Sequence, residues 1–217
     1  DPFGPKTQAG LYGIYADSQS GLTIRNLGVA GAYEGITWVN VDQSTIAGDS
    51  FGANGNNGIY LLNGADTNTI NGNTASNNTG YGIYLLTNCQ YNTLSNNMTN
   101  SNSASGIYLN DNSDRNTISN NVSSSNSSSG IFMQSNTTYN TFCGNTANSN
   151  AAYGIFMAAS SNSTIMLNNV FNSNTIAGIR ITNSNFCSVR MNDVSGSDTG
   201  IWLTGDANSN TISKNNL

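Results

Sequence analysis

Aspartates are the side chains in this sequence whose type and spacing could support acid–base chemistry. Asp66, Asp111, Asp114 and Asp206 each follow a short apolar segment. Asp66 and Asp114 occupy equivalent positions two repeats apart, roughly 10 Å at strand spacing, near the separation of about 6.5 to 9.5 Å used by inverting glycosidases. No long loop builds a cleft around them, and Arg115 is the nearest cation. We therefore expect solvated turn residues that accept backbone hydrogen bonds, no catalytic residues and no enzyme.

Composition removes several other kinds of chemistry. Histidine is absent, so imidazole bases and histidine metal ligands are excluded. Lys plus Arg total 6 against 11 Asp plus Glu, a net charge of -5, and the few cations form no basic stripe for phosphate. No apolar run approaches the roughly 18 residues of a membrane span. We expect no metal, no cofactor, no nucleic-acid partner and no membrane-spanning segment.

Three cysteines could form disulfides. Cys89, Cys143 and Cys187 lie in different repeats and at different phases. Repeats two apart place Cα atoms at about 10 Å or more, beyond the reach of a disulfide. Internal pairing is therefore not expected. Two readings stay open: reduced, inert thiols, or intermolecular disulfides in an extracellular assembly.

Several asparagines match the acceptor pattern for N-glycosylation. Such matches are expected by chance in a chain this rich in Asn, Ser and Thr, and they matter only if the chain is exported. Asn97 and Asn121 also match, but they fall in a regular repeat column. The candidate glycosylation sites are Asn77, Asn126, Asn136 and Asn162.

A column of aromatic residues is the candidate binding surface. Its members follow the same Gly-Ile dipeptide in successive repeats, interrupted by Thr37 and Arg180. Because side chains alternate along a strand, the residue after each inward Ile should point outward. Two readings stay open: a self-stacking ladder that stabilises a sheet, or a contact surface for a second solenoid or for sugar rings. The column consists of Tyr15, Tyr60, Tyr84, Tyr108, Phe132, Phe156 and Trp202.

These side chains are positioned by an internal repeat of 22 to 24 residues. A second anchor of the type Asn68-Thr69-Ile70 follows each Gly-Ile, and a third column of Asn begins near Asn73. Each repeat thus holds three short apolar segments separated by Asn, Ser and Gly. The first anchor recurs at Gly13, Gly35, Gly58, Gly82, Gly106, Gly130, Gly154, Gly178 and Gly200.

Short strands repeated at this period predict a solenoid. One such unit cannot bury its own apolar face, whereas stacked copies bury a continuous one. The sequence therefore predicts an all-β, single-domain parallel β-helix (β-solenoid) of about nine coils of 22–24 residues, with three short strands per coil. Parallel crossovers favour a right-handed path. We expect residues 1–12 to form an extended N-terminal segment and residues 13–217 to form the β-helix.

The Asn excess is explained by this architecture. Asparagine tolerates the left-handed conformation of tight turns and can hydrogen-bond to its counterpart one coil away. Columns such as Asn73, Asn97 and Asn121 are therefore expected to form ladders, and they need no ligand to account for them.

The repeat resembles a known family. Gly106-Ile107-Tyr108-Leu109 and Asn92-Thr93-Leu94-Ser95-Asn96-Asn97 are similar to right-handed parallel β-helix repeats of the NosD type and of the related carbohydrate-binding and sugar-hydrolase group. They are most similar to the Asn-rich repeats of methanogen surface-layer and sheath proteins. The resemblance covers Gly13 to Leu217 and implies the fold more strongly than a function. The resemblance to NosD does not imply copper binding by this chain, since His is absent and the Met and Cys residues are dispersed.

The sequence favours a structural function. Neither end shows a polar or helical cap over the strand edges, and the outer surface is poor in charge. We expect a self-assembling extracellular or cell-surface subunit of a filament, sheath or surface layer, whose partner is the protein itself. It would pack through the aromatic column and the open solenoid ends. The alternative is a carbohydrate-binding or carbohydrate-active β-helix that uses the outer aromatics and the turn aspartates on a glycan.

Overall fold

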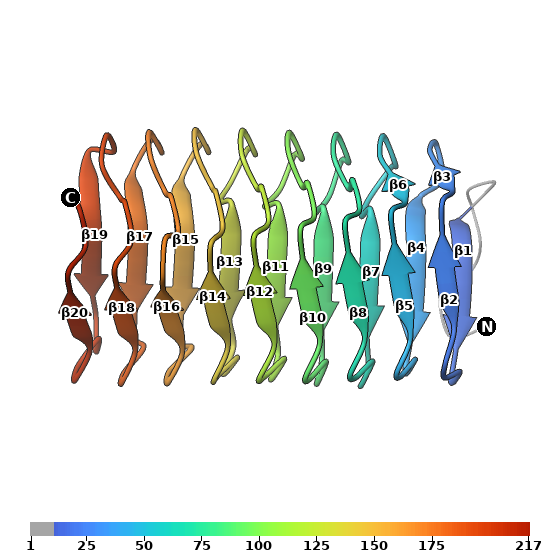
Figure 1. Cartoon of the computed structure of the whole chain (residues 1–217), viewed down its shortest axis with the longest axis horizontal. Helices are drawn as coiled ribbons and strands as arrows, with labels where there is room; N and C mark the ends of the chain where they lie inside the picture. Colours follow the sequence, from blue (N-terminus) through green and yellow to red (C-terminus); the bar gives the residue numbers. More distant parts are fainter. Residues whose placement is uncertain (1–10) are drawn as a thin grey trace.

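The computed structural model describes residues 11–217 and shows a rod of stacked coils (Figure 1). Residues 1–10 of the expected extended segment lie outside the described residues, and the first strand begins at Tyr12. Two nine-stranded parallel sheets run the length of the rod. The parallel β-helix predicted from the repeat is confirmed, and the number of coils is close to the predicted nine.

The first sheet contains the Gly-Ile segments. Its strands stand side by side in chain order, each pairing with its counterpart one coil away. They are β1 (Tyr12–Asp17), β4 (Glu34–Val39), β7 (Ile59–Leu62), β9 (Ile83–Leu86), β11 (Ile107–Asn110), β13 (Ile131–Gln134), β15 (Tyr153–Ala158), β17 (Ala177–Thr182) and β19 (Thr199–Thr204).

The second sheet contains the Thr-Ile segments. Its strands are three residues long and also pair in register, Thr with Thr and Ile with Leu or Ile. They are β2 (Thr23–Arg25), β5 (Thr45–Ala47), β8 (Thr69–Asn71), β10 (Thr93–Ser95), β12 (Thr117–Ser119), β14 (Thr141–Cys143), β16 (Thr164–Met166), β18 (Ser188–Arg190) and β20 (Thr211–Ser213).

The third segment of each coil is shorter than a regular strand in most coils. Within residues 11–217, only β3 (Gly28–Val29) and β6 (Ser50–Phe51) form a sheet there. Beyond them the column continues as single bridges, for example Met98 to Val122 and Val122 to Thr146. The third strand of the prediction is thus reduced to one paired residue per coil over most of the rod.

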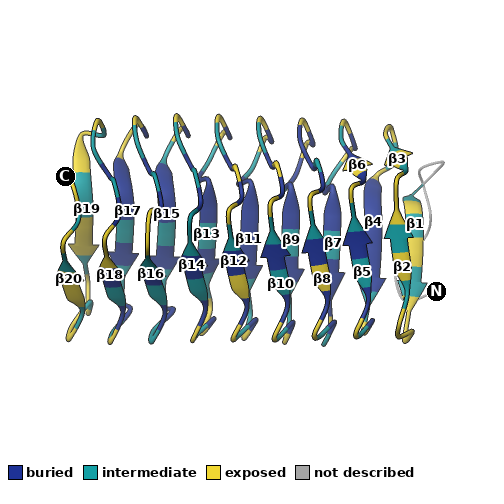
Figure 2. Ribbon diagram, viewed as in Figure 1, coloured by how far each residue is buried: buried dark blue, intermediate teal, exposed yellow. Residues whose placement is uncertain are grey.

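Buried residues run along the strands of both sheets in the interior coils (Figure 2), and their side chains form a core of like-on-like columns between the sheets. Ile83, Ile107 and Ile131 are fully buried in one column, and Leu85, Leu109 and Met133 in the next. The glycine before each Ile allows the coils to approach closely. A Cβ on Gly82 would lie 2.6 Å from the carbonyl oxygen of Gly106, so a larger residue there would force the coils apart.

Buried asparagines tie successive coils together. Asn121 Oδ1 accepts the backbone N–H of Asn97 at 2.9 Å, and Asn121 Nδ2 donates to the backbone carbonyl of Leu94 at 2.9 Å and to Asn145 Oδ1 at 3.0 Å. Each amide therefore satisfies buried backbone groups of the coil before it, which a buried turn requires. The predicted ladder is confirmed in the column Asn73, Asn97, Asn121, Asn145 and Asn169.

Candidate functional site on the turn edge

The aromatic column forms a continuous stack on the first sheet. Ring centroids of Tyr108 and Phe132 are 4.9 Å apart at 10°, and those of Phe132 and Phe156 are 4.9 Å apart at 5°. Tyr60, Tyr84 and Tyr108 continue the stack at 5.0 and 4.7 Å. The ring faces in this stack are turned toward one another, so they are not free to pack against a ligand.

Flanking tyrosines cover part of the stack. Tyr81 tilts against both Tyr84 and Tyr108, at 4.9 and 4.7 Å, and Tyr153 tilts against Phe156 at 5.0 Å. Tyr108 is only 5% exposed as a result. The interpretation of Tyr108 as a contact residue for a partner or a sugar is therefore corrected: neighbouring rings bury it. Burial also raises the pKa values of Tyr60 and Tyr108.

The two ends of the aromatic column differ from its middle. Tyr15 is exposed and contacts the ring of Tyr12 at 5.0 Å. At the other end the guanidinium of Arg180 takes the place of a ring, 5.1 Å from the centroid of Phe156 and 4.5 Å from that of Trp202. Arg180 also donates to the hydroxyl of Tyr153. A planar cation is thus accommodated between rings two coils apart.

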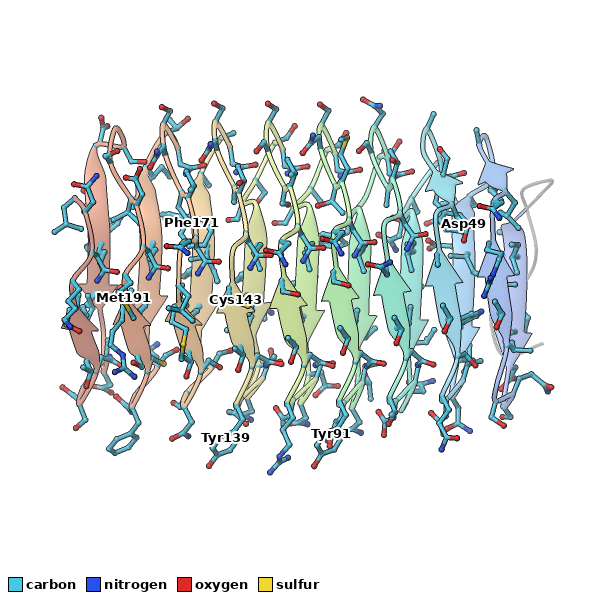
Figure 3. All side chains as sticks on the ribbon, viewed as in Figure 1. Asp49, Tyr91, Tyr139, Cys143, Phe171 and Met191 are labelled. Carbon is cyan, nitrogen blue, oxygen red and sulfur yellow. The ribbon has the colours of Figure 1, made fainter. Side chains whose placement is uncertain are left out.

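A second set of aromatic residues projects from the turn edge, our name for the turns between first-sheet and second-sheet strands. Tyr91 lies between β9 and β10, Tyr139 between β13 and β14, and Phe186 between β17 and β18. Their exposed fractions are 55%, 53% and 65%. Figure 3 shows Tyr91 and Tyr139 pointing away from the rod. These are the most exposed aromatic side chains of the described residues.

Backbone conformation explains why these side chains point outward. Tyr91, Arg115, Tyr139, Asn162 and Phe186 all have φ between 55° and 58°, the left-handed region that L-residues other than Gly, Asn and Asp rarely adopt. Tyr91, Arg115, Tyr139 and Phe186 are each followed by a residue whose backbone N–H bonds to a side chain of the next coil, as Asn92 does to Asn116 Oδ1 at 2.8 Å. The Asn ladder therefore fixes the turn and leaves the preceding side chain in solvent.

Arg115 lies between two of these rings. Its guanidinium carbon is 5.8 Å from the centroid of Tyr91 and 5.2 Å from that of Tyr139, within the range of a cation–π contact. Within residues 11–217 this guanidinium has no ion pair and no side-chain hydrogen bond. Its donors therefore remain available to a ligand.

The turn aspartates are engaged by the backbone. Asp66 Oδ1 accepts the N–H of Gln90 at 2.6 Å, and Asp114 Oδ1 accepts the N–H of Thr138 at 2.6 Å. Burial raises the pKa of Asp66, and the hydrogen bond from Gln90 opposes that rise. Asp111 accepts the hydroxyl of Thr87 at 2.9 Å. The contacts of Asp66 and Asp114 agree with the expected backbone-capping role, whereas Asp111 bonds to a side-chain hydroxyl.

The cysteines differ in access. Cys89 is fully buried, and burial raises the pKa of its thiol to about 12. Cys187 is also buried, and its pKa is raised for the same reason. The interpretation of Cys89 and Cys187 as partners in intermolecular disulfides is therefore corrected, because neither sulfur can reach another molecule when the rod is folded. Cys143 is half-buried on the outer face of β14 and remains a candidate.

The candidate glycosylation sites also separate by burial. Asn77 and Asn136 are exposed, and Asn162 is half-buried on the turn edge. Asn126 is 2% exposed and its amide bonds to Asn150 Oδ1 at 3.1 Å. The prediction for Asn126 is corrected, since a glycan there would remove a rung of a buried ladder.

The stacked coils, paired strands and Asn ladders define a parallel β-solenoid. Residues 7–138 match the family described as "Right handed beta helix region". The chain belongs to this right-handed β-helix family, as the repeat predicted. Residues 111–217 are also similar to the family described as "Periplasmic copper-binding protein (NosD)". Among curated proteins, none matches the sequence.

Solved structures share the fold at low sequence identity. The chain is similar to the periplasmic alginate epimerase AlgG, with a TM-score of 0.81, 20% identity and coverage of 87% of this chain and 48% of that one. It is also similar to the mannuronan C-5 epimerase AlgE6 A-module of Azotobacter vinelandii, with a TM-score of 0.77, 17% identity and coverage of 91% of this chain and 58% of that one. For pectate lyase Pel9A the TM-score is 0.57 and the identity 16%, with coverage of 85% of this chain and 55% of that one. The chain thus spans about half the length of these proteins.

The residues present do not fit a copper site. Copper in proteins is held by grouped His, Cys or Met side chains, and this sequence has no His. Cys89 and Cys187 are buried and their sulfurs lie against backbone carbonyls. Within residues 11–217 no three His, Cys, Asp or Glu side chains gather as metal ligands. The described residues also include no helix that could span a membrane.

Proposed function

We propose that this protein binds glycans along its turn edge. The observation that carries the proposal is the row formed by Tyr91, Tyr139 and Phe186, three rings more than half exposed and set at every second coil. Exposed rings offer apolar faces with little conformational freedom to lose. The unpaired Arg115 adds hydrogen-bond donors for hydroxyl or carboxylate groups.

Similarity of fold supports this choice of partner. The compared structures include proteins named as alginate epimerases and a pectate lyase, whose names refer to polysaccharides. A rod with one exposed ring every two coils presents contacts at about 9.6 Å intervals, a regular spacing suited to a repeating polymer. The glycan site thus lies on the turn edge and not on the stacked column that the sequence indicated.

Binding without cleavage is the form of this function that the site favours. Asp66 and Asp114 each have one carboxylate oxygen held by a backbone N–H of the following coil. The same arrangement occurs at Asp42, which accepts the N–H of Asp66 at 2.8 Å. A general acid and a general base need different surroundings, whereas these carboxylates share the same backbone-capping arrangement.

A location outside the cytoplasm follows from the same proposal. The NosD family is described as periplasmic, and AlgG is named as a periplasmic enzyme. The polysaccharides that such a rod would bind lie in the periplasm or at the cell surface. We therefore propose an extracellular, cell-surface or periplasmic protein.

The test is a binding measurement with a triple variant. The chain carrying Tyr91→Ala, Tyr139→Ala and Phe186→Ala is compared with the wild type by affinity electrophoresis in gels containing soluble neutral polysaccharides or polyuronates. We expect the wild type to be retarded by at least one polymer and the variant to migrate freely. The control is Ile176→Ala, which removes an exposed apolar side chain just before β17, at the opposite turn. Equal retardation of all three proteins would contradict the proposal.

Self-association is a second candidate, favoured by a different surface. Met98, Val122, Leu167 and Met191 are exposed apolar side chains on or beside the bridge column and the second sheet. Side-by-side packing of two copies would remove them from water. Analytical ultracentrifugation and electron microscopy test this directly: concentration-dependent oligomers that Met191→Asp and Leu167→Asp disperse would support it, and monomers at every concentration would exclude it.

A further inference from the structure

The turn edge contains a slot of defined width. Tyr139 and Phe186 project from turns two coils apart, and Asn162 occupies the coil between them. Two coil spacings amount to about 9.6 Å. A flat group placed midway would lie about 4.8 Å from each ring, within the range of ring stacking contacts. We call this space the Tyr139–Phe186 slot.

The neighbouring position shows what such a space holds. Between Tyr91 and Tyr139 the intervening residue is Arg115, whose guanidinium lies 5.8 and 5.2 Å from the two ring centroids. Arg180 lies in the same way between Phe156 and Trp202 on the first sheet. The fold thus twice places a flat group between rings two coils apart. In the Tyr139–Phe186 slot, Asn162 is too short to do so.

The slot lacks an occupant from the described chain. Phe186 is 65% exposed and has no ring contact with any of residues 11–217. The side-chain amide of Asn162 likewise makes no hydrogen bond within these residues. The residues preceding the ring positions in these turns are Thr138, Ser161 and Asn185. The Thr138 hydroxyl donates to the Asp114 carboxylate, and the side chains of Ser161 and Asn185 accept backbone N–H groups of the following coil. The slot therefore combines two apolar walls with the amide of Asn162 and contains no cation.

We propose that the Tyr139–Phe186 slot binds one uncharged pyranose ring of a glycan. The C–H faces of the sugar would pack against Tyr139 and Phe186, and its hydroxyl groups would bond to the amide of Asn162. Apolar walls with a few convergent polar groups are the usual composition of a small-molecule site. A carboxylate would find no cation in this slot, because Arg115 lies on the other side of Tyr139. The inference rests on the proposed glycan binding and names its sugar class and position.

A variant that fills the slot tests the inference. Asn162→Arg reproduces the arrangement of Arg115, and the backbone tolerates it, because Asn162 and Arg115 have φ of 58° and 56°. We expect Asn162→Arg to fold normally by circular dichroism and to lose binding about tenfold, as should Phe186→Ala, since one aromatic contact of about 1.4 kcal/mol corresponds to that factor. Asn162→Gln, which keeps the amide, is the matched control.

The reciprocal variant should create a second slot. Arg115→Asn removes the guanidinium between Tyr91 and Tyr139 and leaves an asparagine there, as at Asn162. We expect the number of bound rings per chain to rise from one to two, or the affinity for a long chain to increase about tenfold. No change in either quantity would contradict the slot as the binding element.

The measurement is isothermal titration calorimetry with neutral hexasaccharides of glucose and mannose, and with a mannuronate hexamer as the charged comparison. The protein is produced in a bacterial host without N-glycosylation, so that Asn162 carries no attached sugar. Tighter binding of a neutral hexamer, lost in Asn162→Arg, supports the inference. Binding of the charged hexamer alone, or binding unaffected by Asn162→Arg and Phe186→Ala, overturns it while glycan binding itself stands. The absence of binding to any sugar overturns both proposals.

Discussion

At the scale of single residues, the ladder asparagines stabilise the fold by satisfying buried backbone groups. Replacing Asn121 with Ala removes the acceptor for the N–H of Asn97 and the donor to the carbonyl of Leu94. Each buried group left unpaired costs about 1 to 3 kcal/mol. We expect Asn121→Ala to lower the free energy of unfolding by about 3 kcal/mol or more in urea titrations. Asn208→Ala, at an exposed position, serves as the control and should change it by less than about 0.5 kcal/mol.

The buried thiol of Cys89 makes stability depend on alkaline pH. Its pKa is raised from 9.0 to about 12 in the folded chain, so the unfolded chain releases this proton first as the pH rises. The stabilisation is complete below about pH 9 and is lost as the pH rises toward 12. We expect the free energy of unfolding to fall by about 1 kcal/mol per pH unit in this range. Cys89→Ala should flatten the decline and Cys143→Ala should not; equal slopes in all three chains would exclude this origin.

At the scale of elements, the aromatic column and the turn edge divide the aromatic residues by role. Phe132 stacks on both Tyr108 and Phe156, whereas Phe186 contacts no ring within residues 11–217. Phe132→Ala should therefore cost about 2 to 3 kcal/mol in thermal or urea unfolding and leave glycan binding unchanged. Phe186→Ala, the same substitution, should cost less than about 0.5 kcal/mol and weaken binding. The opposite pattern would assign the ligand to the stack.

The sequence predicts the sheets better than it predicts the candidate site. Alternation along a strand assigns Ile107 to the core and Phe132 to the outer face, and the structure agrees. Alternation does not extend into turns, where the direction of a side chain depends on φ. Tyr91, Arg115 and Tyr139 take left-handed conformations that their own residue types disfavour, because the following Asn is fixed by the next coil. The available signal was their constant position, one residue before the ladder Asn.

The burial of Tyr108 has a similar explanation. Its phase predicts an outward side chain, and the backbone does place it there. It is buried because Tyr81, on the flank of the sheet, lies against its ring at 4.7 Å. Contacts between residues at different phases of the repeat cannot be derived from the phase of either one, so the extent of the exposed aromatic surface required the structure.

At the scale of the whole molecule, stability is distributed along one dimension. Within residues 11–217 each strand pairs only with its counterparts in adjacent coils, so an interior coil has two paired neighbours and the coils of β1 and β19 have one each among these residues. The burial pattern follows this arrangement: β11 is buried at three of its four residues, whereas β19 has no buried residue. Local opening should therefore begin at the ends of the rod and not in its middle.

Hydrogen exchange measured by mass spectrometry tests this distribution. We expect amides of β1, β2, β19 and β20 to exchange at least about tenfold faster than those of β9 to β12, because opening a terminal coil breaks one interface and opening a central coil breaks two. Asn121→Ala should raise exchange in the coils around β12 and leave β2 unchanged. Uniform protection from β2 to β20 would contradict a nearest-neighbour rod. Protection of the terminal strands that grows with protein concentration would instead indicate that copies cover one another's ends.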